Sequence, residues 1–272
     1  MKFIILIILF FASNFTFAQD VKLFGEAKQG SLLIGKANNA QDIFLDDKKI
    51  QFDENGYFVL GFDRDDLGIY TLVVNFLNGK SHSQKITLKK SKYSVQKLKI
   101  ASKYVEPPKN VLDRIESERE LLKNARKEIG NDIKSYFSSG FTYPVDNVRI
   151  TGVFGNQRIL NGKPQNIHNG IDFGGSESDT VRAISNGIIR FVGNDFYYNG
   201  NFVLIDHGQG LTSIYLHLSK TVVQTGAFIK KGTPLGFVGS TGRSTGPHLH
   251  LGVQWYQKRI DPLSVIKLKI GN

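Results

Sequence analysis

The sequence predicts a mostly β protein in which two β-domains are joined by a helix. Its composition is the first indication: glycine (28), Phe (20) and Tyr (10) are frequent beside one Met and one Trp, which suits strands and tight turns. Short apolar runs are separated by turn signals such as Asn55-Gly56 and Asn78-Gly79. A stretch after Pro107-Pro108 instead repeats its apolar residues at helical spacing. The chain of 272 residues is long enough for one large or two modest domains.

Residues 1–18 have the pattern of a secretory signal peptide. Lys2 precedes an apolar run from Phe3 to Phe11, and the segment ends in a small residue, Ala18. This run is too short to span a bilayer comfortably, and an uncleaved N-terminal anchor is the alternative. Because no second apolar segment of spanning length follows, we expect an exported, soluble mature chain without a stable membrane span.

Charge and cysteine content exclude several classes of function. The chain has no cysteine, which excludes disulfides, thiolate catalysis and a lipid-modified N-terminal cysteine. Its net charge of +11 favours acidic polymers or membrane surfaces as partners. Nucleic acid is the intracellular partner of this kind, but export and the lack of a nucleic-acid motif argue against it. Anionic cell-wall material fits better, and no feature of the sequence fixes an oligomeric state.

Residues 19–104 are predicted to form a small, β-sandwich-like N-terminal domain, because short strand-like runs alternate with regular turn signals. Nothing in this region has the pattern of a catalytic site. His82 lies in a polar stretch and is expected to be an exposed bystander. The predicted strands cover residues 31–35, 42–46, 56–62, 68–76, 85–88 and 95–100.

Residues 105–140 are predicted to be a connector with a helix at 111–129. Asn110 is expected to cap the helix, with Asp113 completing a partial capping box, and Gly130 is expected to end it. We expect one apolar stripe to pack on a neighbouring domain; a partner-binding coiled coil is the alternative, for which about five turns is short. The stripe consists of Leu112, Ile115, Leu122, Ala125 and Ile129.

Residues 141–272 are predicted to form a glycine-rich, all-β C-terminal domain. Strand-like runs alternate with turns, and no convincing amphipathic helix lies between them. The predicted strands cover residues 181–184, 187–192, 201–206, 211–216, 235–239 and 249–255.

Five of the six histidines lie in this C-terminal region. His248 and His250 form a His-x-His pair, and in a strand both imidazoles point to the same face. His168 and Asp172 are four residues apart, so they also share a face in extended chain. A zinc site with an open position uses three protein ligands, which His168, Asp172 and one histidine of the pair can supply. Imidazole and carboxylate donors favour zinc over calcium or magnesium, so one zinc ion is expected.

The order of these residues resembles the LytM/lysostaphin-type zinc metallopeptidases, which are peptidoglycan endopeptidases. The resemblance covers about residues 141–265, and the front half matches exported Gram-negative members more loosely. Supporting residues include Phe154-Gly155 with Arg158, Gly170 to Phe173, and Gly239 to Gly242. The motifs that carry it are His168-x-x-x-Asp172, Tyr215-x-His217-Leu218 and Gly246-Pro247-His248-Leu249-His250.

The resemblance implies a role for each residue of the set. His168, Asp172 and His250 are the implied zinc ligands, and His217 and His248 fall on the family's two non-ligand catalytic histidines. This allocation is chemically reasonable: the sequence has no His-Glu-x-x-His helix, so a histidine must accept the proton of the attacking water. The resemblance does not say which of the two histidines is the base. His207 matches the family pattern without being a ligand and is expected to be structural or to support the site.

The resemblance further implies a zinc-dependent endopeptidase of the periplasm that hydrolyses peptide cross-links of peptidoglycan at the D-alanyl–meso-diaminopimelate bond. A glycyl-glycine endopeptidase, a wall-binding module and a non-catalytic regulator of a cell-wall amidase are the alternatives. The intact set of ligands and histidines argues against the last two. The N-terminal domain could also cover the substrate groove and inhibit the enzyme.

Two features of the C-terminal region have competing interpretations. Residues 242–246 fit the G-x-S-x-G pattern of serine hydrolases, but that motif needs a strand before it and a helix after it. We expect a flexible turn leading into the His-x-His strand instead. Tyr197-Tyr198 could line a substrate groove or pack within its own loop.

Overall fold

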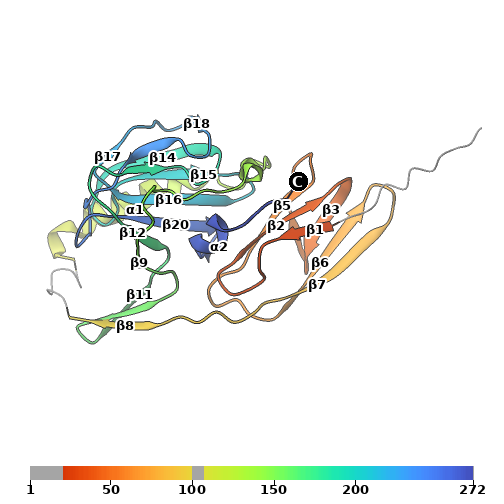
Figure 1. The fold of residues 1–272 in the computed structure, drawn as a ribbon, viewed down its shortest axis with the longest axis horizontal. Helices are drawn as coiled ribbons and strands as arrows, with labels where there is room; N and C mark the ends of the chain where they lie inside the picture. Colours follow the sequence, from red (N-terminus) through yellow and green to blue (C-terminus); the bar gives the residue numbers. More distant parts are fainter. Residues whose placement is uncertain (1–20, 100–106, 272) are drawn as a thin grey trace, which may run out of the picture.

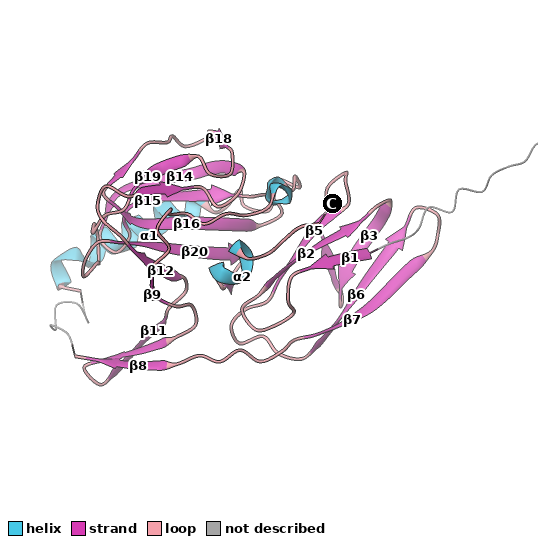
Figure 2. Ribbon diagram, in the orientation of Figure 1, coloured by secondary structure: helices cyan, strands magenta, loops and turns pink. Residues whose placement is uncertain are grey.

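A computed structural model describes residues 21–99 and 107–271, and the expected signal peptide at 1–18 lies outside this range. Strands dominate the described chain, and they form two bodies that lie next to each other (Figures 1 and 2). The predicted mostly β fold class is confirmed. In the part of the chain that the structure describes, no helix has the length and apolar character needed to cross a membrane.

The N-terminal body consists of two antiparallel sheets with strand orders β1-β2-β5 and β4-β3-β6-β7 (Figure 1). Strands β1 and β4 are additions to the predicted set, and β4 follows a tight turn in which Asp46 has a positive φ. The strands are β1 (Val21–Phe24), β2 (Leu32–Ala37), β3 (Ala40–Leu45), β4 (Lys48–Ile50), β5 (Tyr57–Gly61), β6 (Ile69–Phe76) and β7 (Ser81–Thr87).

Side-chain alternation explains how these strands form a core. Along β6, Leu72, Val74 and Phe76 are buried while their neighbours are more exposed. Phe58 lies opposite Gly35 in register, and a Cβ at Gly35 would come within 1.9 Å of the phenyl ring. The ring therefore occupies space that only glycine leaves free, and burying such a side chain stabilises the fold by roughly 1.5–3 kcal/mol.

The chain leaves β7 in an extended path and reaches β8 (Val95–Leu98) beside the C-terminal body (Figure 1). There β8 pairs in parallel with β10 (Gln157–Leu160), which in turn pairs with β11 (Lys163–Ile167). The strand predicted at 95–100 is thus present, but it belongs to a sheet of the C-terminal body, although it lies within the range assigned to the N-terminal domain. Strand pairing over a long sequence separation leaves no local signal in the sequence.

The connector helix is shorter than predicted and is capped differently. A 3₁₀ turn, η2 (Lys109–Val111), leads into α1 (Leu112–Ala125), whose N-cap is Val111 without a side-chain hydrogen bond. The predicted cap by Asn110 is therefore wrong, and the helix ends five residues before Gly130, with turns between them. Because η2 already supplies a first turn, no polar side chain is needed at the start of α1.

The stripe of the connector helix packs on the C-terminal body only in part. Leu122 and Ile129 contact a small buried cluster that includes Phe196 and Phe202, whereas Leu112 is exposed. The helix is also held by the Glu118 carboxylate, which accepts a hydrogen bond from a backbone amide in the loop at residue 197 (2.8 Å). The predicted contact with a neighbouring domain is observed for the C-terminal half of the stripe.

The C-terminal body is built on an eight-stranded sheet with the order β18-β14-β15-β16-β20-β12-β9, and β21 pairs with β20. A smaller sheet has the order β13-β19-β17. The remaining strands are β9 (Ile150–Gly152), β12 (Ile171–Gly174), β13 (Thr180–Arg182), β14 (Gly187–Phe196), β15 (Gly200–Asp206), β16 (Leu211–Leu218), β17 (Lys220–Thr221), β18 (Phe228–Ile229), β19 (Pro234–Phe237), β20 (His248–Trp255) and β21 (Lys258–Ile260).

Two short helical segments accompany these strands. The 3₁₀ turn η3 (Tyr136–Ser139) precedes the first strand of the sheet. The helix α2 (Pro262–Ile266) was not predicted: the Asp261 carboxylate caps it by accepting from the amide of Leu263, and Pro262 begins it. At five residues, α2 is too short for an apolar period to reveal it.

The two bodies share one continuous hydrophobic core. Trp255 at the end of β20 lies so close to Gly61 of β5 that a Cβ at Gly61 would be 2.8 Å from the indole. The Gln209 side-chain amide donates to the carbonyls of Tyr57 and Ile133, both at 2.9 Å, and thereby links the N-terminal body, the connector and the large sheet. The N-terminal body is therefore held against the sheet that carries the histidines.

Candidate metal centre

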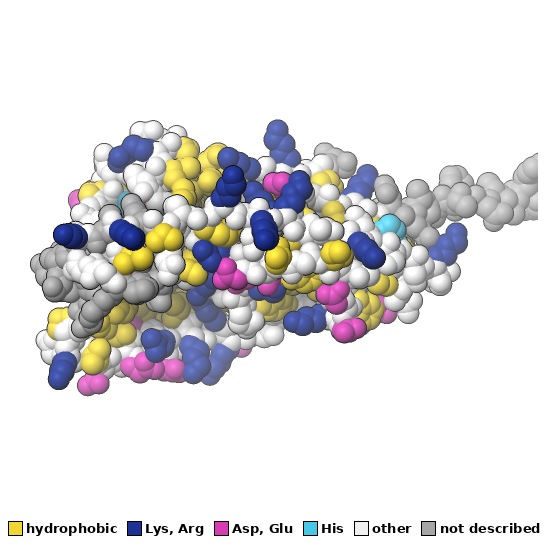
Figure 3. Space-filling view, turned by 90° about the horizontal axis from the view of Figure 1, so that it is seen from below, with side chains coloured by type: hydrophobic (Ala, Val, Ile, Leu, Met, Phe, Trp, Pro, Cys, Tyr) yellow, Lys and Arg dark blue, Asp and Glu magenta, His cyan; other side chains and the backbone are white. Residues whose placement is uncertain are grey.

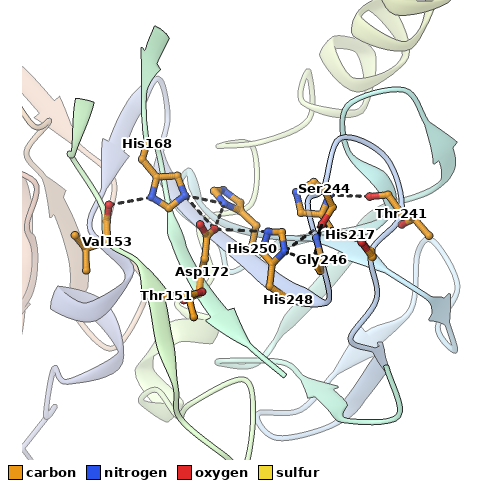
Figure 4. Close-up of polar contacts among 11 residues, drawn as sticks. Thr151, Val153, His168, Asp172, His217, Thr241, Ser244, Gly246, His248 and His250 are labelled. Atoms are coloured by element: carbon orange, nitrogen blue, oxygen red, sulfur yellow. Dashed lines mark hydrogen bonds and ion pairs between the residues drawn. The ribbon is translucent and has the colours of Figure 1, made fainter. Parts of the chain in front are cut away.

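Three side chains converge at neighbouring strands of the large sheet. Strand β12 pairs with β20 so that Asp172 lies directly opposite His250. The Asp172 Oδ1 is 2.8 Å from His250 Nδ1 and 3.0 Å from His168 Nε2, and the two histidine nitrogens are 3.1 Å apart (Figure 4). In the part of the chain that the structure describes, these three residues each place one potential ligand atom within 4.8 Å of the other two, as a metal site requires.

His168 reaches this cluster from a loop. The extended chain expected between His168 and Asp172 is interrupted, because His168 lies between β11 and β12 and the chain bends at Gly170. A Cβ at Gly170 would lie 2.4 Å from the carbonyl oxygen of Leu251 and 2.5 Å from His250 Nε2. Glycine at this position therefore lets the loop pass close to β20 without displacing the imidazole of His250.

The donor set fits a zinc ion. The His168 Nδ1 lies 2.9 Å from the carbonyl oxygen of Val153, which accepts the Nδ1 proton and leaves Nε2 as the atom that faces the cluster. Donor atoms around a tetrahedral zinc with bonds of about 2.0–2.1 Å are about 3.3 Å apart. The three separations here are slightly shorter than that, and an imidazole–imidazole–carboxylate set suits zinc.

Asp172 is held in its charged form. Burial alone would raise the pKa of its carboxyl, but hydrogen bonds and charge interactions with His168 and His250 outweigh burial and lower the pKa well below its usual range. An anionic oxygen is thus available at every pH of interest, as a metal ligand requires.

Two further histidines lie beside the cluster on the same face. His248 precedes His250 by two residues on β20, and its Nε2 is 4.0 Å from Asp172 Oδ1. The rings of His217 and His248 have centroids 4.9 Å apart (Figure 4). His217 Nδ1 lies 2.9 Å from the carbonyl oxygen of Thr241, and His248 Nδ1 lies 2.8 Å from that of Gly246. Because these carbonyls only accept, both rings present an unprotonated Nε2 when neutral.

His217 is aimed by a β-bulge. Strand β15 pairs Val203 with Tyr215 but Asn201 with Leu218, so β16 contains one extra residue at this point. His217 lies in the bulge with φ +66°, a left-handed conformation that is unfavourable for residues other than glycine. Burial, together with the charge of neighbouring His248, lowers the pKa of His217 to about 4, which keeps this imidazole neutral at neutral pH.

The bulge predicts a measurable strain at His217. His217→Gly should have a free energy of unfolding about 1 kcal/mol higher than His217→Ala, because only glycine adopts positive φ without steric cost. Urea unfolding of the two metal-free variants measures this difference. Thr212 lies in the same strand but has no positive φ, so there the alanine variant should be more stable than the glycine variant. Equal stabilities of the two His217 variants would mean that the bulge imposes no strain.

The comparison with known families identifies the region that contains this cluster. The model of peptidase family M23 matches residues 166–262, which include all three converging side chains and both adjacent histidines. This part of the chain belongs to peptidase family M23. The resemblance to LytM/lysostaphin-type peptidases that the sequence suggested is thereby confirmed.

Similar proteins give the match a context. A DD-carboxypeptidase/endopeptidase, Mpg, of Neisseria meningitidis serogroup B is 38% identical over 122 residues, covering 45% of this chain and 28% of that protein. The peptidoglycan DD-endopeptidase ShyA of Vibrio cholerae is 40% identical over 111 residues, covering 40% of this chain and 25% of that protein. The matches to these curated relatives thus span little more than a quarter of their length.

A solved structure resembles both bodies of the chain. The crystal structure of a putative peptidase M23 from Pseudomonas aeruginosa superposes with a TM-score of 0.62 and 25% identity. The superposition covers 89% of this chain and 95% of that one, so it extends beyond the M23 region into the N-terminal body.

The structure brings together all five side chains that the sequence singled out in the M23 domain and places His207 elsewhere. His207 is completely buried; its Nδ1 lies 2.6 Å from the carbonyl oxygen of Asn186 and its Nε2 lies 2.8 Å from Ser213 Oγ. Burial lowers its pKa to about 4. Both ring nitrogens therefore bind core groups and not the metal cluster. In the N-terminal body, His82 is half-buried instead of exposed as expected.

Ser244 of the G-x-S-x-G stretch lies in a turn that leads directly into β20. Its hydroxyl donates to the carbonyl of Gly246 (2.8 Å) and lies 3.2 Å from His248 Nδ1. The strand after the turn takes the place of the helix that a serine-hydrolase elbow requires. The Tyr198 ring packs against the same turn, with the guanidinium of Arg243 5.6 Å from the ring centroid.

Several residues that shape the site were not recognised from the sequence. The carbonyl oxygens of Val153, Thr241 and Gly246 orient three of the imidazoles. At Gly152, a Cβ would lie 2.3 Å from Asp172 Oδ2, so this glycine leaves room for the carboxylate. Every residue has a backbone carbonyl, so the sequence cannot indicate which carbonyls orient the imidazoles. A glycine on the strand next to a predicted ligand, in contrast, could have been recognised as leaving room for the carboxylate.

Proposed function

We propose that this chain is a zinc-dependent endopeptidase that hydrolyses peptide cross-links of peptidoglycan, with the D-alanyl–meso-diaminopimelate bond as its substrate. The observation that carries the proposal is the arrangement in Figure 4: a three-donor cluster and, on the same face, two further imidazoles whose Nδ1 atoms each face a backbone carbonyl. Similarity to proteins named as DD-endopeptidases supports the substrate class. The complete donor set argues against a non-catalytic regulator.

His168 Nε2, Asp172 Oδ1 and His250 Nδ1 would hold the ion and leave a fourth position open. A bound zinc ion supplies Lewis acidity there, polarising the scissile carbonyl and acidifying water to a pKa of about 7. The His250 pKa is lowered mainly by burial, which favours the neutral ring that a metal ligand needs.

His217 and His248 would transfer the protons of the reaction. In its neutral form, each ring can accept a proton at Nε2 from the attacking water, because its Nδ1–H is already committed to a backbone carbonyl. Once protonated, the same Nε2 can donate to the leaving amine or to the oxygen that develops charge. The His248 side chain is 19% exposed, against 9% for His168 and 10% for Asp172, so it lies nearer to the substrate side.

A hollow of about 270 Å³ beside His168 supports a peptide as the substrate. Its walls include Val95, Ile150 and Val153, whose apolar side chains are each more than 40% exposed. A short methyl-bearing peptide stem could bury this surface. Lys and Arg side chains are spread along the face of the molecule seen in Figure 3, in keeping with an anionic cell-wall polymer.

The proposed substrate places the protein outside the cytoplasm, and we propose the periplasm as its compartment. The signal pattern at residues 1–18 supports export. Periplasmic cross-links carry meso-diaminopimelate, which is the reason for preferring this bond over a glycyl-glycine bridge.

Purified muropeptides test the proposed substrate. The zinc-loaded protein should convert dimers joined by D-alanyl–meso-diaminopimelate bonds into monomers, as measured by chromatography and mass spectrometry. It should leave pentaglycine-bridged material intact under the same conditions. Intact D-alanyl–meso-diaminopimelate dimers after prolonged digestion would refute the proposal, and cleavage of pentaglycine alone would reassign the bond.

A further inference from the structure

The loop at residues 153–156 fixes the ligand His168 on three sides. The carbonyl of Val153 accepts from the His168 Nδ1–H (2.9 Å). The amide of Gly155 donates to the His168 carbonyl (2.9 Å), and the carbonyl of Asn156 accepts from the His168 amide (2.9 Å). The direction of the His168 ring therefore depends on where this loop lies.

The other side of the same loop is held by the N-terminal half of the chain. The guanidinium of Arg64, just after β5, donates from Nε to the carbonyl of Gly155 (2.8 Å). It also lies over the ring of Tyr93, 4.4 Å from the ring centroid. That ring packs directly on Gly155, where a Cβ would come within 2.2 Å of it. Arg64, Tyr93 and Gly155 thus form a stacked contact between the two bodies.

Phe154 completes this contact from within the loop. It is 5% exposed, and its ring meets the Tyr93 ring edge-on with centroids 6.3 Å apart. A Cβ at Gly30 would lie 2.8 Å from the Phe154 ring, so the N-terminal body leaves a place for this side chain. One apolar anchor and one charged hydrogen bond therefore tie the loop to residues far away in the sequence.

We propose that Arg64 and Tyr93 are positioning residues of the metal centre, through which the N-terminal body raises the affinity for zinc. They act through the loop at 153–156, which directs the Nε2 of His168 at the shared metal position. Partners that orient a metal-binding histidine typically contribute 10- to 100-fold to metal affinity. The inference rests on the proposed zinc site. It gives the N-terminal body a role that supports the enzyme, whereas an N-terminal domain that covered the substrate groove would inhibit it.

Zinc affinity of full-length variants tests the proposal, measured by competition with a chromophoric chelator. Arg64→Ala and Tyr93→Ala should each weaken zinc binding about 10-fold. Tyr93→Phe keeps the ring that packs on Gly155 and should bind zinc like the wild type. Arg64→Lys keeps the charge without the planar stack and should weaken binding to an intermediate degree, which provides a milder variant if an alanine variant fails to fold.

Lys258→Ala is the matched control for the contact between the two bodies. Lys258 forms an ion pair with Asp66, in the same turn as Arg64, but it makes no polar contact with the loop at 153–156. Its zinc affinity should stay within about twofold of the wild type, because only the loop transmits the effect. Thermal unfolding of the metal-free proteins separates loss of zinc affinity from loss of stability.

Wild-type zinc affinity in Arg64→Ala, Arg64→Lys and Tyr93→Ala would overturn the proposal. An equal loss in Lys258→Ala would also overturn it, because docking of the bodies in general would then be the cause. The two proposals fail separately: a wild-type protein that binds zinc but cuts no muropeptide refutes the enzyme activity, whereas the positioning role is decided by the dissociation constants for zinc alone.

Discussion

His248→Ala should lower kcat for muropeptide cleavage by about three orders of magnitude, within the range that general acid–base catalysis contributes. The reason is that His248 Nε2 lies beside the metal cluster, 4.0 Å from Asp172 Oδ1, while its Nδ1–H is held by the carbonyl of Gly246. Zinc binding should persist, because the three donors His168, Asp172 and His250 are untouched. Steady-state kinetics and zinc content of the purified variant measure both quantities.

His82→Ala is the control for replacing a histidine outside the site, since His82 lies on β7 of the N-terminal body. It should leave kcat unchanged. Full activity in His248→Ala would contradict the proposed role of His248. Loss of zinc in the same variant would mean instead that His248 is a ligand.

Asp172→Asn should weaken zinc binding more than 100-fold, beyond the 10- to 100-fold typical of residues that only orient a ligand. The amide has nearly the same shape as the carboxylate but lacks its charge. In the wild type, His168 and His250 more than offset the effect of burial and lower the Asp172 pKa, which keeps this oxygen anionic. Titration with a competing chelator measures the change in the dissociation constant.

Asp146→Asn provides a matched control, because Asp146 is an exposed carboxylate of the same part of the chain that faces Arg182 at 3.6 Å. Its zinc affinity should equal that of the wild type. An Asp172→Asn variant that binds zinc as tightly as Asp146→Asn would exclude Asp172 from the ligand set.

Much of the fold was predictable because its signals are local. The Asn78-Gly79 dipeptide predicted the hairpin between β6 and β7, where Gly79 has φ +79°. Alternation along β20 predicted that His248 and His250 share a face, and Figure 4 shows both rings on the same side of the strand. For these elements, residue type and spacing are sufficient because the determining contacts lie within a few residues.

The features that could not be predicted depend on contacts distant in the sequence. Strand β8 pairs with β10, some sixty residues away in the chain, and its own residues contain no sign of that partner. The β-bulge that directs His217 arises from pairing with β15 and not from the histidine itself. The stacked contact of Arg64 and Tyr93 with the loop at 153–156 likewise forms only when the two bodies are folded against each other, so neither residue carries a local sign of it.

Removing and restoring zinc tests whether this chain is a zinc-dependent endopeptidase. The wild-type protein is stripped with a chelator, dialysed, and incubated with purified D-alanyl–meso-diaminopimelate dimers before and after addition of zinc. We expect no monomer release from the metal-free protein and full recovery when one zinc ion per chain has bound. Monomer release at the original rate without metal would show that the protein does not depend on zinc, and dimers that stay intact after zinc is restored would exclude the proposed activity.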